Sequence, residues 1–190
     1  GQFHVEIDTP SGGHTLMAGA VVQATGSRPY DAGKLGHLGY GVSPNVVTAS
    51  RLDEMLAGGG VTRPTDGKLP GRIVFVQCAG SRDPQHLPYC SADCCGTTLR
   101  QVAQIHQAHP EVETAVIYRD MRTPGQTERF YAAVQQQPGS MFTRGEVASI
   151  SGNGTLKVRL KDSLLGDDVE LQADLLVLAT GAVPNSADGE

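Results

Sequence analysis

Several features are scarce in this sequence of 190 residues, and each absence excludes a class of protein. Trp is absent and aromatic residues make up only 5%, which argues against a stacking platform for single-stranded nucleic acid or sugars. The 15 basic and 20 acidic residues give a net charge of −5 without a Lys/Arg run, so we expect no nucleic-acid partner. No apolar stretch approaches the ~20 residues of a membrane span, and the first residues lack the pattern of a signal peptide. We therefore expect a soluble, cytoplasmic protein.

Two further features are missing or rare. No G-x-G-x-x-G turn, the usual dinucleotide-binding fingerprint, follows a strand anywhere in the sequence. The four cysteines are too few for a disulfide-stapled secreted scaffold. They are nevertheless clustered, at Cys78, Cys90, Cys94 and Cys95. Clustering of this kind indicates chemistry more than stapling.

The pattern of apolar residues predicts an α/β fold. Residues 72–77, "RIVFVQ", form a continuous β-branched and aromatic run that is typical of a buried parallel strand. A helix should follow, capped by Ser91 and ended by Pro110, and residues 114–118, "TAVIY", predict the next buried strand. Residues 72–118 are thus interpreted as a βαβ unit with a parallel sheet.

The segments on either side are expected to be mostly β-structure. The N-terminal residues predict a hairpin that leads into a buried strand. Residues 46–48 predict a short strand before a helix that starts at Ser50, with Asp53 completing a capping box. The C-terminal stretches "MFTRGEVASI", "LKVRLKDS" and "VELQADLLVLATG" predict a three-stranded antiparallel β element.

The βαβ interpretation should bring the cysteines together. In such a unit, the carboxyl end of the first strand faces the amino end of the following helix. Cys78 ends the strand, Cys94 and Cys95 fall in the first helical turn, and Cys90 comes just before it. We expect all four thiols at one edge of the sheet, where the positive end of the helix dipole favours thiolates.

Three kinds of site are compatible with the spacing C-x11-C-x3-C-C: an iron–sulfur cluster, a structural zinc, and a dithiol or buried core thiols. Structural zinc sites usually take two C-x2-4-C knuckles, which the adjacent Cys94 and Cys95 fit poorly. A redox dithiol normally shows C-x-x-C, which is absent. A cluster tolerates uneven spacing because several irons share the ligands, and it usually takes four thiolates. The spacing favours the cluster and leaves the alternatives open.

Other polar residues near the cysteines have competing interpretations. Arg119, Asp120 and Arg122 follow the second strand, where a nicotinamide-binding domain reads the ribose or its 2′-phosphate. A solvated charged loop is favoured, because cysteines replace the phosphate-binding turn. His86 lies between the cysteines and is a candidate ligand or proton shuttle, although a loop histidine is more often solvated.

The motif V-x-A-T-G-x-x-P occurs at residues 22–29 and again at 177–184. It resembles the segments by which two-dinucleotide-binding-domain flavoproteins of the thioredoxin reductase type cross out of the FAD domain and back. The resemblance implies a piece of a longer protein whose FAD fingerprint lies upstream of Gly1. The implied parts are the end of the FAD domain (1–30), a connector with a short helix (31–70), a Rossmann-like, NAD(P)-binding-like inserted domain (71–184) and a return segment (185–190). The implied FAD-side residues are Thr25, Gly26, Gly181 and Pro184, and the isolated chain is not expected to retain FAD.

A closer resemblance is carried by "VFVQCAGSRD", "PYCSADCC" and "LLGDDVELQADLLVLATGAVP". These stretches are similar to the A subunit of heterodisulfide reductase and its relatives, which include flavin subunits of quinone-interacting electron-transfer complexes. The resemblance implies an FAD-containing oxidoreductase subunit with a [4Fe–4S] cluster ligated by the four cysteines. Electrons would pass between the flavin and the cluster toward other subunits of such a complex, with a homodimer as a further possibility. No side chain here is expected to act as a catalytic acid or base.

Two other functions remain as alternatives. One is a redox-inactive docking domain, in which zinc or a disulfide holds the cysteine loop. The other is an NAD(P)H-binding reductase domain that uses Arg119 and Arg122.

Overall fold

The computed structural model describes residues 1–152 and 154–188, which divide into two compact units. One unit combines Gly1–Arg28 with the chain from Pro184 onward, and the larger unit is Pro29–Val183. Two short strands, β3 (Ser27–Pro29) and β11 (Ala182–Pro184), span the points where the chain crosses between the units. All four cysteines therefore belong to the larger unit.

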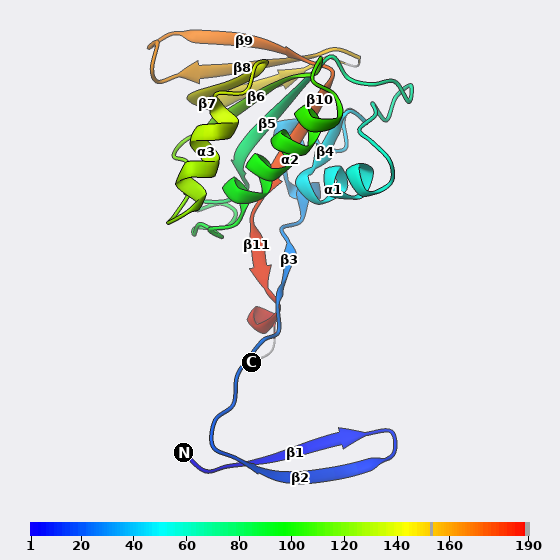
Figure 1. The fold of residues 1–190 in the computed structure, drawn as a ribbon, viewed down its shortest axis with the longest axis vertical. Coiled ribbons are helices and arrows are strands. Elements are labelled where there is room, and N and C mark those ends of the chain that lie inside the picture. Colours follow the sequence, from blue (N-terminus) through cyan, green and yellow to red (C-terminus); the bar gives the residue numbers. More distant parts are fainter. Residues whose placement is uncertain (153, 189–190) are drawn as a thin grey trace. The chain divides into compact units, whose positions relative to one another are not determined.

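The larger unit is built on one seven-stranded sheet in the order β4-β10-β5-β6-β7-β8-β9 (Figure 1). Neighbouring strands from β4 to β7 are parallel, and β7, β8 and β9 are antiparallel. The strands are β4 (Val46–Thr48), β5 (Arg72–Ala79), β6 (Glu113–Tyr118), β7 (Ser140–Ser151), β8 (Leu156–Asp162), β9 (Asp168–Ala173) and β10 (Leu175–Thr180). The expected α/β class is confirmed, with the antiparallel strands joined to the parallel sheet through β7.

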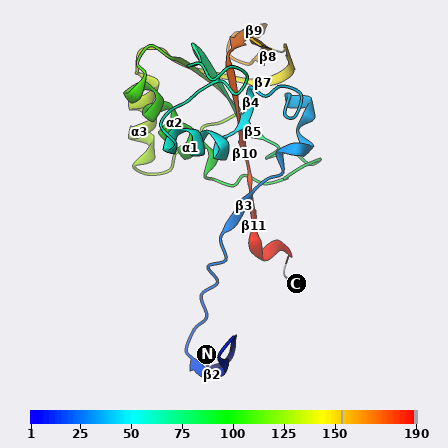
Figure 2. The same cartoon turned by 90° about the vertical axis from the view of Figure 1, so that its right-hand side faces the viewer.

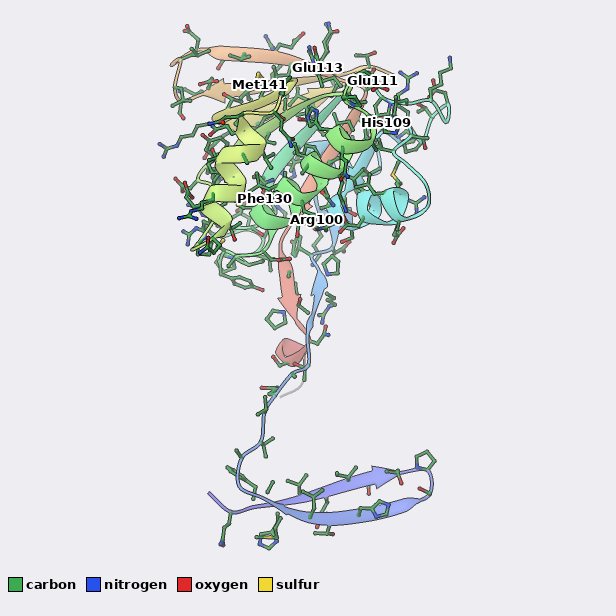
Figure 3. The ribbon with its side chains drawn as sticks, in the orientation of Figure 1. Arg100, His109, Glu111, Glu113, Phe130 and Met141 are labelled. Carbon is green, nitrogen blue, oxygen red and sulfur yellow. The ribbon has the colours of Figure 1, made fainter. Side chains whose placement is uncertain are left out.

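Three helices cover one face of this sheet, and the segment of residues 30–40 lies on the other (Figure 2). The helices are α1 (Ala49–Ala57), α2 (Cys94–Ala108) and α3 (Thr127–Gln135), and the opposite segment contains the short 3₁₀ helices η1 (Ala32–Lys34) and η2 (Gly36–Leu38). Arg100 on α2 and Phe130 on α3 lie on the solvent side of the helix layer (Figure 3). None of the helices described is long and apolar enough to cross a membrane.

Strand β5 is the centre of the core. Ile73 and Phe75 pack into the cluster on the helix side, whereas Val74 and Val76 pack into the cluster on the opposite side. Each fully buried side chain of this size contributes about 1.5–3 kcal/mol through removal of apolar surface from water. The strand is therefore buried on both faces, as its unbroken apolar run predicts.

The predicted start of α1 is wrong by one residue. The helix begins at Ala49, and the Oγ1 atom of Thr48 accepts a hydrogen bond from the Arg51 N–H at 3.1 Å. Thr48 thus satisfies an N–H group of the first turn that would otherwise lack a partner, in the place expected for Ser50.

The last predicted strand is also wrong, because the stretch "VELQADLLVLATG" forms two strands. The break lies at Asp174, whose Oδ2 atom accepts hydrogen bonds from the N–H groups of Gly71 (2.8 Å) and Arg72 (3.1 Å). This carboxylate ties the break to the start of β5, so that β10 enters the sheet between β4 and β5 instead of extending the edge strand β9.

The smaller unit contains the predicted hairpin, formed by β1 (Phe3–Thr9) and β2 (Gly12–Ala18) in antiparallel register. The buried strand expected after it is wrong: residues 19–26 form neither helix nor strand, and Val22 is 86% exposed. An apolar run becomes a strand only where a neighbouring strand completes its hydrogen bonds, and none of the described strands does so here. The C-terminal part contains the short helix η3 (Asn185–Asp188), and residues 189–190 of the predicted return segment lie outside the described residues.

Candidate functional site

The fold brings the four cysteines to one edge of the sheet, as the βαβ pattern predicts. Cys78 lies at the end of β5, Cys94 and Cys95 open α2, and Cys90 lies in the loop that joins the two elements. All four are free thiols; Cys95 is buried and the other three are half-buried. They are near enough that the charge of Cys90 raises the pKa of each of the other three thiols.

The loop between β5 and α2 is held by its own backbone. The Ser81 N–H donates to Cys78 O at 3.0 Å, the Leu87 N–H to Gly80 O at 3.0 Å, and the Arg82 N–H to a carbonyl further along the loop at 3.1 Å. Among the described residues other than glycine, positive φ angles occur only here, at Cys78 (56°), Arg82 (57°) and Ala92 (60°). Backbone of this kind is costly for L-residues and is concentrated at functional sites, where the surrounding structure maintains it.

The predicted cap of α2 has a different role. Ser91 does not cap the helix, which begins after Asp93 without a side-chain cap. Its Oγ atom accepts a hydrogen bond from the Ala182 N–H at 2.7 Å, and the Gly181 carbonyl accepts one from the Tyr30 N–H at the same distance. The segment that follows β10 is thus fastened to the cysteine loop.

Gly181 is packed against the cysteine loop. A Cβ atom at this position would lie 2.8 Å from a methyl group of Leu87, 3.0 Å from Ser91 Oγ and closer still to Ser81 Oγ. At this copy of the A-T-G motif, the glycine thus allows the backbone to approach a neighbouring protein segment closely.

The other predicted FAD-side residues lie in the smaller unit. The Asn185 side chain donates to the Thr25 carbonyl at 2.8 Å, and its N–H donates to the Gly26 carbonyl at 3.1 Å. Pro184 directly precedes Asn185, so the structure brings these three predicted residues together, while Gly181 belongs to the larger unit.

Burial dominates the ionisation of the thiols. It raises the pKa of Cys94 to about 12, and the charges of Cys78 and Cys95 add to this effect. Burial also raises the pKa of Cys78 and of Cys95. The expectation that thiolates are favoured at this edge is not met by these three free thiols, because desolvation by burial is the largest cause and raises the pKa of each.

Each of three thiols also has a main-chain partner. Cys94 Sγ lies 3.4 Å from the Thr180 carbonyl, and Cys90 Sγ accepts a hydrogen bond from the Ala92 N–H at 3.4 Å. Cys95 Sγ accepts one from the Arg122 N–H at 3.4 Å. The N–H donors that point to sulfur are of the kind that stabilise a thiolate once it forms.

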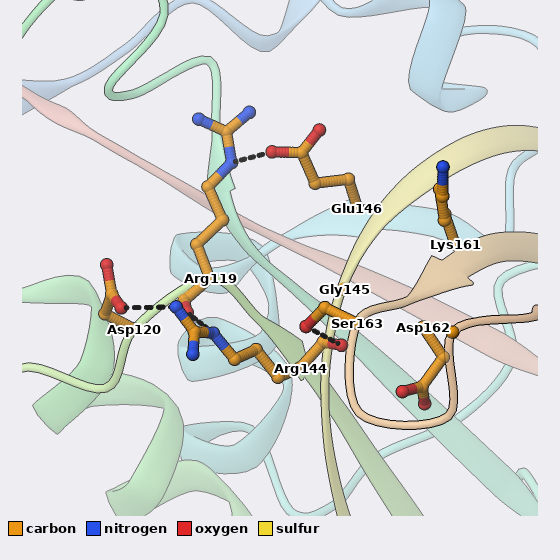
Figure 4. A pocket seen from close by; sticks show the side chains of 9 residues that line it. Arg119, Asp120, Arg144, Gly145, Glu146, Lys161, Asp162 and Ser163 are labelled. Atoms are coloured by element: carbon orange, nitrogen blue, oxygen red, sulfur yellow. Dashed lines mark hydrogen bonds and ion pairs between the residues drawn. The ribbon is translucent and has the colours of Figure 1, made fainter.

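A network of arginines and acids involves the loop after β6 and the strand β7 (Figure 4). Arg119 pairs with Glu146 at 3.1 Å, and Arg144 pairs with Asp120 at 3.4 Å. Arg82 also binds Asp120, at 2.9 Å, and holds the pKa of that carboxyl below its usual range. The network borders an open pocket of about 610 Å³.

This network bears on the interpretation of the loop after β6. Arg119 and Asp120 are each paired with a residue of the protein, and Asp120 and Arg122 are exposed to solvent, as in a solvated charged loop. Arg144 and Glu146 were not predicted from the sequence. They reach the site only because β7 pairs in parallel with β6 and places Arg144 opposite Tyr118.

His86 contacts other aromatic side chains. Its Nδ1 atom lies 2.8 Å from the Tyr30 hydroxyl oxygen, and its ring stacks on His37 with a centroid separation of 5.7 Å. These contacts account for its imidazole without a metal.

The four thiols and their neighbours can be matched to the ligands that a single metal ion or a cluster needs. Among residues 1–152 and 154–188, no three His, Cys, Asp or Glu side chains meet as the ligands of a single metal ion would. Zinc needs all of its thiolates at about 2.3 Å from one point, whereas an iron–sulfur cluster offers several separate irons. Two buried polar atoms at this loop, Arg82 Nη1 and Ser81 Oγ, lack a hydrogen-bond partner. Four thiols with unpaired donors beside them fit an anionic cluster better than a single ion.

Comparisons with known proteins show which proteins the chain is related to. No protein-family model matches it. It is 41% identical over 181 residues to the iron-sulfur A subunit 2 of CoB--CoM heterodisulfide reductase from Methanopyrus kandleri, and 40% identical over 179 residues to the iron-sulfur A subunit of the same enzyme from Methanocaldococcus jannaschii. These matches cover 90% and 89% of the chain, but only 28% and 27% of the relatives.

Solved structures support the fold alone. L-lysine 6-monooxygenase from Pseudomonas syringae aligns with a TM-score of 0.54 at 13% identity, covering 98% of this chain and 51% of the monooxygenase. Ornithine N-hydroxylase from Kutzneria sp. 744 aligns with a TM-score of 0.51 at 15% identity, covering 100% of this chain and 52% of the hydroxylase. The sequence matches carry the relationship: the chain is a homologue of one segment of the heterodisulfide reductase A subunit, as its cysteine motifs indicated.

Proposed function

We propose that this chain is the part of an oxidoreductase subunit that holds a [4Fe–4S] cluster through Cys78, Cys90, Cys94 and Cys95. In the full-length protein the cluster would exchange electrons with FAD. The observation that carries the proposal is the convergence of four mutually interacting thiols at the edge where a nicotinamide-binding domain has its phosphate turn. The names of both relatives, which include the word "iron-sulfur", support it.

The electrostatics of the site agree with metal binding. As free thiols, Cys78, Cys94 and Cys95 have pKa values raised by burial, and ionising several of them together would place like charges side by side. Iron removes this penalty, because it binds the thiolates and the protons are released. When bound, a cluster supplies one-electron transfer. The chain positions the sulfur atoms on β5 and α2, and the packing of Leu87 and Gly181 fixes the loop that joins them.

The part of the proposal that concerns FAD depends on the smaller unit and on the two segments where the chain passes between the units. We propose that residues 1–30 and 185–190 belong to the FAD domain of the full-length protein, with Thr25, Gly26, Gly181 and Pro184 at its crossings. The chain spans less than a third of the length of the relatives it matches. The isolated chain should therefore not retain flavin, and stoichiometric yellow flavin after purification would refute this part.

The partners are proposed from the relatives. One of these is the A subunit of H(2)/formate:CoB-CoM heterodisulfide,ferredoxin reductase from Methanococcus maripaludis, and it is 37% identical over 185 residues. We propose that the full-length protein likewise works with other subunits, of a heterodisulfide reductase-like or quinone-interacting complex, and that these carry electrons onward.

Anaerobic reconstitution tests the cluster. Wild type should bind about four irons and four sulfides per chain with broad visible absorption, and Cys94→Ser should lower both. His86→Gln is the matched control, because its imidazole is already paired with Tyr30, and it should bind as much iron as wild type. Zinc without iron or sulfide would favour the docking alternative. A chain that binds no iron at all would refute the proposal.

A further inference from the structure

Arg82 is fixed in the cysteine loop by its backbone. Its φ of 57° lies in the left-handed region, so this position is maintained by its neighbours. Its N–H donates to the Tyr89 carbonyl at 3.1 Å, and its carbonyl accepts a hydrogen bond from Arg119 Nη1, also at 3.1 Å. The backbone of Arg82 is therefore held in place by these hydrogen bonds, whatever its guanidinium binds.

The guanidinium lies between a carboxylate and a thiol. On one side, Nη2 donates to Asp120 Oδ2 at 2.9 Å, and Arg144 holds the other oxygen of Asp120 at 3.4 Å. On the other side is Cys78, near enough that the thiol and the guanidinium each shift the other's pKa. Nη1 is buried and has no hydrogen-bond partner. Nη2 is thus occupied within the protein, and Nη1 is a buried donor without a partner on a guanidinium that lies beside Cys78.

A buried N–H of a cationic side chain that has no partner indicates an anionic acceptor. Arg119, which is held by Glu146, also places a positive charge near Cys78, and Arg122 places one near Cys95. Of these three arginines, only Arg82 combines an anchored backbone, a fixed carboxylate partner and a buried donor without a partner.

We propose that Arg82 is a positioning residue that donates a hydrogen bond from Nη1 to sulfur at the Cys78 corner and raises the reduction potential of the cluster. The inference rests on the proposed cluster. Reduction adds one negative charge to a group that four thiolates already make anionic. A fixed positive charge and a hydrogen bond at the sulfur stabilise the reduced form more than the oxidised form, so the potential rises.

Asp120 and Arg144 have a supporting role in this scheme. They hold the guanidinium in one orientation, so that its position does not depend on whether sulfur accepts the bond. The Arg82 charge is therefore beside the cluster in both oxidation states. Its contribution to the reduction potential is the difference between its interaction with the reduced cluster and its interaction with the oxidised cluster.

The test is a redox titration of the reconstituted chain, followed by electron paramagnetic resonance of the reduced cluster. Arg82→Gln removes the charge and should lower the equilibrium constant for one-electron reduction about tenfold, which corresponds to about 59 mV. Arg82→Lys keeps the charge without the planar fork and should show a smaller decrease, about two- to threefold. Arg100→Gln is the matched control: it removes one positive charge from α2, where Arg100 pairs with Asp53 at 3.0 Å, and should leave the potential unchanged (Figure 3).

The outcomes separate the two proposals. If wild type binds no iron, the proposed function fails before Arg82 is examined. If wild type and Arg82→Gln bind equal iron at equal potentials, the role of Arg82 is wrong and the cluster stands. A shift of the same size in Arg100→Gln would also overturn it, because net charge alone would then explain the effect. If Arg82→Gln does not assemble a cluster, the reduction potential of Arg82→Lys tests the proposal instead. A potential equal to that of wild type in Arg82→Lys would contradict the proposed hydrogen bond.

Discussion

The packing of Gly181 against the cysteine loop gives a prediction with an internal control. In Gly181→Ala the new Cβ would lie 2.8 Å from Leu87, closer than real Cβ contacts come, and 3.0 Å from Ser91 Oγ, which is tighter than most. Overpacking of this kind costs about 1–3 kcal/mol. For a chain of 150–250 residues, each kcal/mol corresponds to roughly 2–4 °C in Tm, so we expect a decrease of about 2–12 °C.

Gly96 is the matched control, because it also lies beside the cysteines. It is in the first turns of α2, and a Cβ there would meet nothing within 4 Å. Gly96→Ala should therefore stabilise the helix by about 0.5–1 kcal/mol. The two glycine-to-alanine changes should move Tm in opposite directions, measured by calorimetry and by urea unfolding. Gly181→Ala at or above the wild-type Tm would refute the close packing of the crossing segment on the cysteine loop.

Two further predictions concern stability. Asp174→Ala leaves the N–H groups of Gly71 and Arg72 without their acceptor and should cost about 0.5–1.5 kcal/mol in urea unfolding, with Asp174→Asn between it and wild type; equal midpoints would contradict this. Burial lowers the pKa of His106 below its ordinary 6.5, so the unfolded chain takes up a proton more readily than the folded chain. The free energy of unfolding should therefore fall as the pH drops below about 6.5 and through the folded-state pKa. His106→Gln should remove this part of the pH dependence, and an unchanged slope of the urea midpoint against pH would count against it.

The parts of the fold that could be predicted from the sequence are those with a strong local signal. The run at residues 72–77 predicted a buried strand, and the stretch between Ser91 and Pro110 predicted the helix that follows it. Together they placed four cysteines at one edge, because the order of strand, loop and helix decides which ends meet.

The failures have tertiary causes. No local pattern marks Asp174 as a break, because its role depends on N–H groups at the start of β5, about a hundred residues earlier. Ser91 matches a helix cap in sequence but binds the segment after β10 instead. The pairing of Arg144 with Asp120 depends on the register between β6 and β7, which no motif encodes.

The ionisation of the thiols was misjudged for a related reason. The helix dipole can be inferred from sequence, but the depth of burial that raises the pKa of Cys94 to about 12 appears only when the loop is folded over the site.

The most direct test of the central claim is anomalous diffraction at the iron edge, from anaerobically grown crystals of the reconstituted chain. The account predicts one compact iron peak at the end of β5, bounded by the Sγ atoms of Cys78, Cys90, Cys94 and Cys95. Iron bound elsewhere, a zinc signal in its place, or a cysteine among the four whose sulfur is not a ligand would contradict it.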